Sequence, residues 1–296
     1  MCTLDQRIVE ASVGLPDGAG VTGWAALAWR GARWFDGVGV DGRPRAVPVV
    51  SAHHDIRLRP GLAVSAERLD PRDVEVVDTL PMTTAVRSVW FESRYQPTLI
   101  GSGRAIDMAA YDDLVTIDEL WAWSHEHPGW TGAPRFREAL ALASENAWSP
   151  MEVDPRVIWV VVADLPPLLC NQPLFDRRGG FIATPDLLDL EAGMAIEYEG
   201  PTHLRVGQRA RDVRREELFR RHGLEYMVVV AVDVGDEQRL AARMHGIRGR
   251  SRFQAESERT WTIIPPPWWI PTTTVAERRA LSDEQRSTLL GHRKAA

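Results

Sequence analysis

The stretch from Thr184 to His203 reads TPDLLDLEAGMAIEYEGPTH and sets carboxylates around two short apolar runs. Successive side chains of a β-strand point to opposite faces, so a strand over residues 194–200 would carry Glu197 and Glu199 on one face. Two carboxylates that lie this close raise each other's pKa unless water or a cation relieves the repulsion. The pair therefore indicates either a solvated face or a metal site.

Asp186 favours the metal site. It lies eleven residues before Glu197, and residues 191–193 between them have the composition of a turn. A hairpin formed at this turn would bring Asp186 beside Glu197. Oxygen ligands on adjacent strands suit Mg²⁺ or Mn²⁺, which prefer carboxylate and water.

The segments on both sides of this hairpin predict the elements that position it. In chain order they are a helix from 149, strands over 168–175, 181–190 and 194–199, an arginine-rich helix over 204–223 and an unbroken apolar strand over 226–232, which is expected to sit centrally in the sheet. Ser149 and Pro150 are typical of a helix start, where Glu152 would complete a capping box. Pro155 and the β-branched run 157–162 predict a short or distorted helix.

The spacing Asp186-x10-Glu197-x-Glu199-Gly-x-x-His203, followed by the arginine-rich helix, resembles a family of domains of unknown function. That family is related to the very-short-patch-repair endonucleases of the PD-(D/E)XK nuclease superfamily, and the resemblance covers about residues 149–233. It implies a restriction-endonuclease-like α-β-β-β-α-β core that uses Mg²⁺ or Mn²⁺. Asp186, Glu197 and Glu199 would be the metal ligands, and Glu152 would point into the site, a role compatible with its place in a capping box.

The superfamily's usual lysine is replaced by Glu199, and Lys294 is the chain's single lysine. The resemblance assigns His203 as the group that moves protons, with Arg215 as a clamp on phosphate; without the motif, His203 reads as a turn histidine. An arginine-rich helix is usually a solvated face, but beside an acidic site it can bind the DNA backbone. We expect four arginines to make these contacts: Arg209, Arg211, Arg214 and Arg215.

Residues 1–146 predict a smaller mixed α/β domain. Its β-branched runs at 47–50, 62–65 and 74–77 predict a small antiparallel sheet, and the tryptophan-rich stripe beginning at Trp24 predicts core packing. The segment VDTLPMTTAVRSVW, which begins at Val77, and the helices after it resemble a region found in AbiEi-type antitoxin-like regulators. This resemblance implies a protein partner or a homodimer formed through this domain. Residues 147–247 form the nuclease-like domain. In the extension over 248–296 the run PPPWW is expected to dock on that domain.

The 296 residues have a net charge of −6, and no apolar run is long enough to span a bilayer. Together with the absence of a signal-peptide pattern, this predicts a cytoplasmic protein without membrane contact. We expect a metal-dependent endonuclease that hydrolyses DNA phosphodiesters. The alternatives are a catalytically inactive DNA-binding or antitoxin-like regulator that keeps the nuclease fold, and an interaction scaffold whose acidic face holds no metal.

Overall fold

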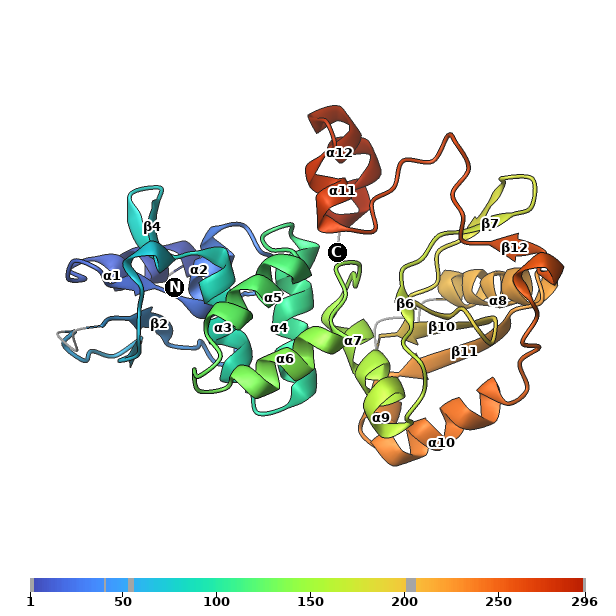
Figure 1. The fold of residues 1–296 in the computed structure, drawn as a ribbon, viewed down its shortest axis with the longest axis horizontal. Helices are drawn as coiled ribbons and strands as arrows, with labels where there is room; N and C mark the ends of the chain where they lie inside the picture. Colours follow the sequence, from blue (N-terminus) through green and yellow to red (C-terminus); the bar gives the residue numbers. More distant parts are fainter. Residues whose placement is uncertain (1–2, 40, 53–55, 201–205, 295–296) are drawn as a thin grey trace. The chain divides into compact units, whose positions relative to one another are not determined.

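The computed structural model describes residues 3–39, 41–52, 56–200 and 206–294. The chain divides into two compact units, Met1–Ala143 and Ser144–Ala296. The division lies three residues before the predicted domain boundary, and residues 248–296 belong to the second unit. Both units combine helices with strands, so the protein is of the α+β class (Figure 1). Within the described ranges, no helix has the length and apolar character needed to cross a membrane.

The first unit contains a five-stranded sheet with the spatial order β3-β2-β1-β5-β4. Its strands are β1 (Gly20–Val21), β2 (Val47–Val50), β3 (Leu62–Ser65), β4 (Val74–Val77) and β5 (Leu80–Thr83). β2, β3 and β4 have the predicted bounds, but the sheet is mixed and not antiparallel throughout as predicted. β1 is antiparallel to β2, and β4 to β5. β2 pairs with β3, and β1 with β5, in parallel. Residues 51–61 connect β2 to β3, and a connection of this length lets the chain return to begin a parallel neighbour, which a tight hairpin cannot do.

The helices of the first unit enclose an aromatic core. They are α1 (Leu4–Ser12), α2 (Gly23–Trp29), η1 (Pro71–Asp73), α3 (Ala85–Arg94), α4 (Leu99–Tyr111), α5 (Ile117–Glu126) and α6 (Ala133–Leu142). The fully buried Trp90 of α3 lies with its ring centroid 4.9 Å from those of Trp123 and Phe136. Trp24 of α2 and Phe35 are also buried, so the predicted core role is confirmed at these positions of the stripe, whereas Trp34 is exposed.

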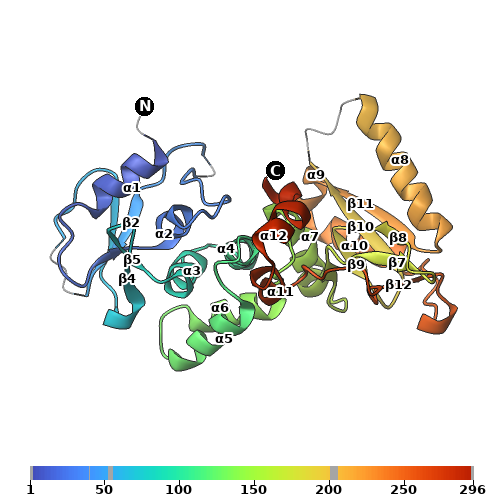
Figure 2. The ribbon, with the colours of Figure 1, turned by 90° about the horizontal axis from the view of Figure 1, so that it is seen from above.

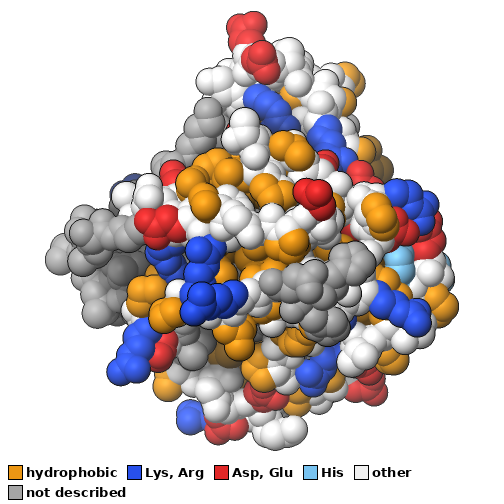
Figure 3. Space-filling model, turned by 90° about the vertical axis from the view of Figure 1, so that its left-hand side faces the viewer, with side chains coloured by type: hydrophobic (Ala, Val, Ile, Leu, Met, Phe, Trp, Pro, Cys, Tyr) orange, Lys and Arg blue, Asp and Glu red, His pale blue; other side chains and the backbone are white. Residues whose placement is uncertain are grey.

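The surface of this unit mixes side chains of all kinds. Its exposed apolar residues include Val13, Leu58 and Val76. On the face shown in Figure 3, arginines and acidic residues are interspersed with such apolar side chains, and the basic groups do not gather into one field. Charge on that face therefore gives no indication of a nucleic-acid surface.

The second unit begins with α7 (Pro150–Val157), which continues as one π-helical turn, η2 (Ile158–Val162). Its four-stranded sheet has the order β11-β10-β9-β6, so the prediction that the strand beginning near Tyr226 sits centrally is wrong: β11 is an edge strand. These strands are β6 (Leu169–Cys170), β9 (Leu187–Asp189), β10 (Met194–Glu199) and β11 (Glu225–Val230). β9 is antiparallel to both β6 and β10, as the predicted hairpin requires, whereas β10 and β11 are parallel and are connected through α8 (Val206–Arg221).

The two long strands predicted before β10 are each interrupted. Their outer halves form the hairpin β7 (Leu174–Asp176) and β8 (Phe181–Ala183), which joins β12 (Trp261–Thr262) in a separate three-stranded sheet beside the first (Figure 2). One interruption falls at Asn171, whose φ of 45° is left-handed. The other includes Pro185, which has no N–H to donate to a strand ladder. The chain thus leaves one sheet and re-enters it at Asp186.

Helices flank the four-stranded sheet on both sides. In Figure 1, α8 lies on one side and α10 (Glu237–Arg248) on the other, with the short α9 (Ala231–Val234) between β11 and α10. On the α8 side, Phe219 packs with Leu188, Ala195 and Tyr226 in a buried cluster. This cluster places α8 over the face to which Glu197 belongs, because Ala195 and Glu197 are two residues apart on β10.

The C-terminal segment docks on the second unit, as predicted for the PPPWW run. After α10 it forms η3 (Glu256–Glu258), β12, α11 (Val275–Arg279), α12 (Asp283–Leu289) and η4 (Gly291–Lys294). Trp261 is buried in the cluster beneath α8. The ring of Trp269 stacks on that of Phe181, with centroids 5.5 Å apart.

Candidate active site

Three polar residues form a row across neighbouring strands of the four-stranded sheet. The backbone N–H of Asn171 donates to the carbonyl of Asp186 at 2.9 Å. On the other side, Leu187 pairs with Ile196, and the same register continued by one residue sets Asp186 opposite Glu197. Residues opposite each other on adjacent strands point to the same face. Asp186 and Glu197 therefore share the face that α8 covers. Asn171, at the end of β6, has a left-handed φ of 45° and directs its side chain to Glu152 and Asn146.

Glu152 joins this row from α7. Its carboxylate is buried and accepts hydrogen bonds from the Asn171 side-chain amide at 2.6 Å and from the Trp148 backbone N–H at 2.9 Å. Ser149 makes no side-chain bond that caps the helix, so the expected reciprocal capping box is not formed. The Glu152 carboxylate thus holds the chain just before α7 and contacts the row on the sheet.

Glu152 and Asp186 disfavour each other's negative charge. Burial, and then the nearby Asp186 carboxylate, raise the pKa of Glu152 to about 8, although hydrogen bonds from Trp148 and Asn171 oppose the rise. The Asp186 carboxylate in turn accepts the backbone N–H of Tyr198 at 2.7 Å. Near neutral pH this arrangement holds a proton at Glu152 or favours a cation beside the pair.

Asn171 positions Glu152 through a reciprocal contact with Asn146. The Asn171 side chain donates to the Asn146 carbonyl at 2.7 Å, and the Asn146 side chain donates to the carbonyls of Cys170 and Asn171. Neither asparagine was among the sequence-predicted site residues. Asparagine is one of the few residue types that adopt the left-handed conformation. This preference, in an asparagine beside a loop that contains proline, is the sequence feature that could have indicated Asn171.

Arg215 of α8 binds Glu197 with both ends of its fork. Its Nε and Nη2 donate to the two carboxylate oxygens at 2.9 and 2.8 Å, and Nη2 also donates to the Thr184 carbonyl. Burial lowers the pKa of Arg215, but the bonds to Glu197 outweigh that effect and raise the pKa above its usual value. We expected this guanidinium on phosphate, whereas in the structure it neutralises Glu197.

The remaining predicted residues divide into two groups. Glu199 follows Glu197 on the same face of β10 and is partly exposed. Burial of Tyr226, together with the carboxylates of Glu197 and Glu199, raises the pKa of the Tyr226 hydroxyl. Arg214 is exposed on α8. His203 and the side chains of Arg209 and Arg211 lie outside the described residues.

The site's donor chemistry fits a hard divalent cation, because Glu152, Asp186, Glu197 and Glu199 offer only oxygen. Within the described part of the chain, no three acidic, histidine or cysteine side chains are grouped closely enough to hold a metal ion. In the structure, Arg215 engages both oxygens of Glu197. A cation that used Glu197 would have to displace the guanidinium.

Comparisons with protein-family models, with curated proteins and with solved structures find no match to this chain.

Proposed function

We propose that the second unit is a restriction-endonuclease-like domain that hydrolyses DNA phosphodiester bonds with the help of Mg²⁺ or Mn²⁺. Its order α7-β6-β9-β10-α8-β11, with the hairpin β7-β8 inserted, supports this assignment. It corresponds to the α-β-β-β-α-β order that the motif's resemblance implies, and its last two strands, β10 and β11, are parallel.

The observation that carries the proposal is the meeting of Glu152 from α7 with Asp186 from the sheet. A buried carboxylate whose pKa is about 8 is costly to leave ionised, and its neighbour is a second carboxylate. If Glu152 had only a structural role, a neutral amide side chain at this position would avoid the second negative charge. A site that recruits a cation needs such anionic oxygens, because their attraction for the ion offsets their repulsion of each other.

Asp186 and Glu197 would hold the cation, with Glu152 and Glu199 completing or supporting the ligand set. When bound, the ion supplies an activated water and neutralises charge that develops on the phosphate. Asn171 orients Glu152, and the Tyr198 N–H orients Asp186. Arg215, once released from Glu197, is within the same site and has the fork geometry that binds a phosphate.

The exposed arginines of α8 would contact the DNA backbone. Arg214, Arg220 and Arg221 are exposed on this helix, and Arg220 is partly occupied by ion pairs with Glu216 and Glu225. Although the chain has a negative net charge, a basic helix next to the acidic centre would attract the DNA phosphates at this part of its surface.

Cleavage of supercoiled, linear, mismatched and single-stranded DNA, with and without Mg²⁺ or Mn²⁺, tests the proposal. Asp186→Asn and Glu197→Gln should each remove metal-dependent cleavage, because each deletes an anionic ligand and keeps its size. Glu191→Gln changes an exposed acid in the same hairpin and should leave cleavage intact. Cleavage that survives in both carboxylate variants would show that this site is not the nuclease centre.

A catalytically inactive DNA-binding regulator is the second candidate, and the ion pair between Arg215 and Glu197 favours it. The pair neutralises the Glu197 carboxylate with a positive charge from the chain itself. DNA binding by the wild type without cleavage in any metal would support the regulator.

A further inference from the structure

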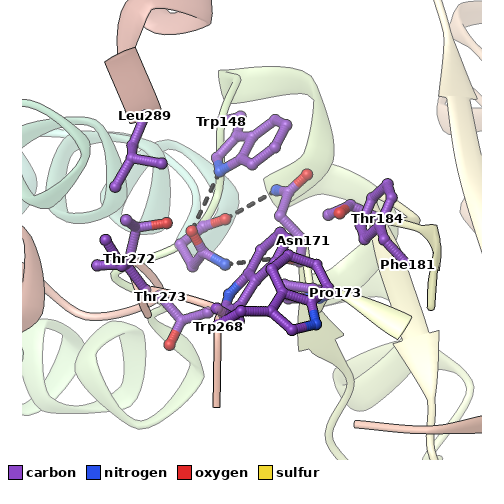
Figure 4. A pocket seen from close by; sticks show the side chains of 12 residues that line it. Trp148, Asn171, Pro173, Phe181, Thr184, Trp268, Thr272, Thr273 and Leu289 are labelled. Carbon is purple, nitrogen blue, oxygen red and sulfur yellow. Dashed lines mark hydrogen bonds between the residues drawn. The ribbon is translucent and has the colours of Figure 1, made fainter. Parts of the chain in front are cut away.

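The second unit contains a cavity of about 420 Å³ lined by Asn171 and Thr184, among other residues. Two of its lining residues also contact the candidate active site: the Asn171 side chain bonds Glu152, and the Thr184 carbonyl accepts a bond from Arg215. Figure 4 shows Trp148 and Trp268 on opposite sides of the cavity in that view, with Asn171 between them. A ligand here would therefore contact residues that are hydrogen-bonded to Glu152 and Arg215.

The walls of this cavity are aromatic and largely fixed. Phe181 stacks on Trp269 at an interplanar angle of 11°, and the Trp268 ring meets that of Trp269 edge-on at 5.6 Å. Trp148 is held by a hydrogen bond from its indole N–H to the Asn146 side chain at 3.1 Å. Trp268 nevertheless remains 60% exposed, so an apolar ring face is left in water beside a polar site.

Polar groups line the same cavity. Thr272 and Thr273 from the C-terminal segment face it together with Asn146 and Asn171. Flat aromatic walls with a few hydrogen-bonding groups fit a planar heteroaromatic ring that carries polar edges. The space is sufficient for a base with its sugar, and it adjoins groups suited to phosphate.

We propose that this cavity binds one unpaired nucleobase of the DNA substrate, extruded from its strand and stacked on Trp268. The inference rests on the proposed endonuclease function and narrows its substrate to DNA with an unpaired or extrudable base at the cleavage site. Extrusion costs least where the base has no partner, so the cavity would select such sites.

Binding measured in EDTA tests this proposal independently of cleavage. The full-length protein is titrated into three labelled duplexes: one fully paired, one with a single bulged 2-aminopurine, and one with an abasic residue at the bulge. Wild type should bind the 2-aminopurine bulge most tightly and quench its fluorescence. Trp268→Ala should weaken that binding roughly 5- to 150-fold, the range expected for one base stacked on an aromatic ring.

Trp34→Ala is the matched control, because Trp34 is 38% exposed in the first unit, and it should behave as wild type. Equal affinity for the three duplexes, no detectable binding, or an unchanged Trp268→Ala variant would overturn the inference. The two proposals fail separately. Base-dependent binding without cleavage in any metal would reject the endonuclease alone, and cleavage without base preference would reject the cavity's role alone.

Discussion

The guanidinium of Arg215 covers both carboxylate oxygens of Glu197, at 2.9 and 2.8 Å, on the face of β10 that also carries Glu199. A positive charge therefore already occupies the position beside Glu197 that a metal ion would require. Arg215 and a cation compete for one carboxylate.

This competition predicts opposite effects of Arg215→Gln on two measurements. The variant should bind Mn²⁺ more tightly than wild type in isothermal titration, because no guanidinium has to be displaced. It should cleave DNA more slowly, because the phosphate loses a bidentate partner. Stability without metal should fall by about 1 to 2 kcal/mol, less than for a fully buried pair because the Arg215 side chain is 36% exposed. Arg214→Gln, one residue earlier and exposed, should leave Mn²⁺ affinity unchanged; weaker Mn²⁺ binding by Arg215→Gln would contradict the competition.

The raised pKa of Glu152 predicts a pH-dependent stability. Its pKa is about 8 in the folded protein against an ordinary value of 4.5, so between these values the folded state binds more protons than the unfolded state. Stability from this group is present below about pH 4.5 and is lost as pH rises to 8. Glu152→Gln should remove that loss, so relative to wild type it gains on the order of a few kcal/mol between pH 5 and pH 9. Urea denaturation at both pH values measures the difference in the free energy of unfolding. If the stabilities of the two proteins changed with pH in parallel, the titration of Glu152 would not be coupled to folding.

Asn171 combines a left-handed backbone with the amide that holds Glu152, and two substitutions separate these contributions. Asn171→Gly keeps the backbone conformation and loses the amide bonds to Glu152 and Asn146, which should cost about 1 to 3 kcal/mol. Asn171→Ala should cost about 1 to 2 kcal/mol more, because its Cβ disfavours positive φ. Chemical denaturation measures both variants. Equal stability of the alanine and glycine variants would mean that the loop relaxes out of the left-handed conformation.

The α8 arginines predict a salt-dependent affinity for DNA. Changing Arg209, Arg211 and Arg214 together to Gln should weaken binding to all sequences alike. It should also reduce the slope of log K against log salt by about 0.9 for each phosphate that the protein no longer neutralises. Arg239→Gln, exposed on α10, serves as the control. An unchanged slope in the triple variant would place the DNA elsewhere.

Local pattern alone determined much of the scaffold. The β-branched runs predicted β2, β3 and β4 with their observed bounds, and the hairpin that brings Asp186 opposite Glu197 followed from a turn between two apolar runs. Thr116 and Glu119 form a capping box at the start of α5, which depends only on a threonine and a glutamate three residues apart. Such features depend on residues close in the chain, whose side-chain periodicity and hydrogen-bonding types are readable directly.

Tertiary structure decided which segments pair and which charges meet. The sequence patterns did not reveal that β2 and β3 pair in parallel, that a left-handed Asn171 ends β6, or that Asn171 then holds Glu152. Arg215 was expected to bind phosphate, but α8 packs through Phe219 onto the sheet, and this packing carries the guanidinium to Glu197. Contacts between residues far apart in the chain depend on how buried surfaces pack together, and this packing cannot be predicted from the spacing of residues within one segment.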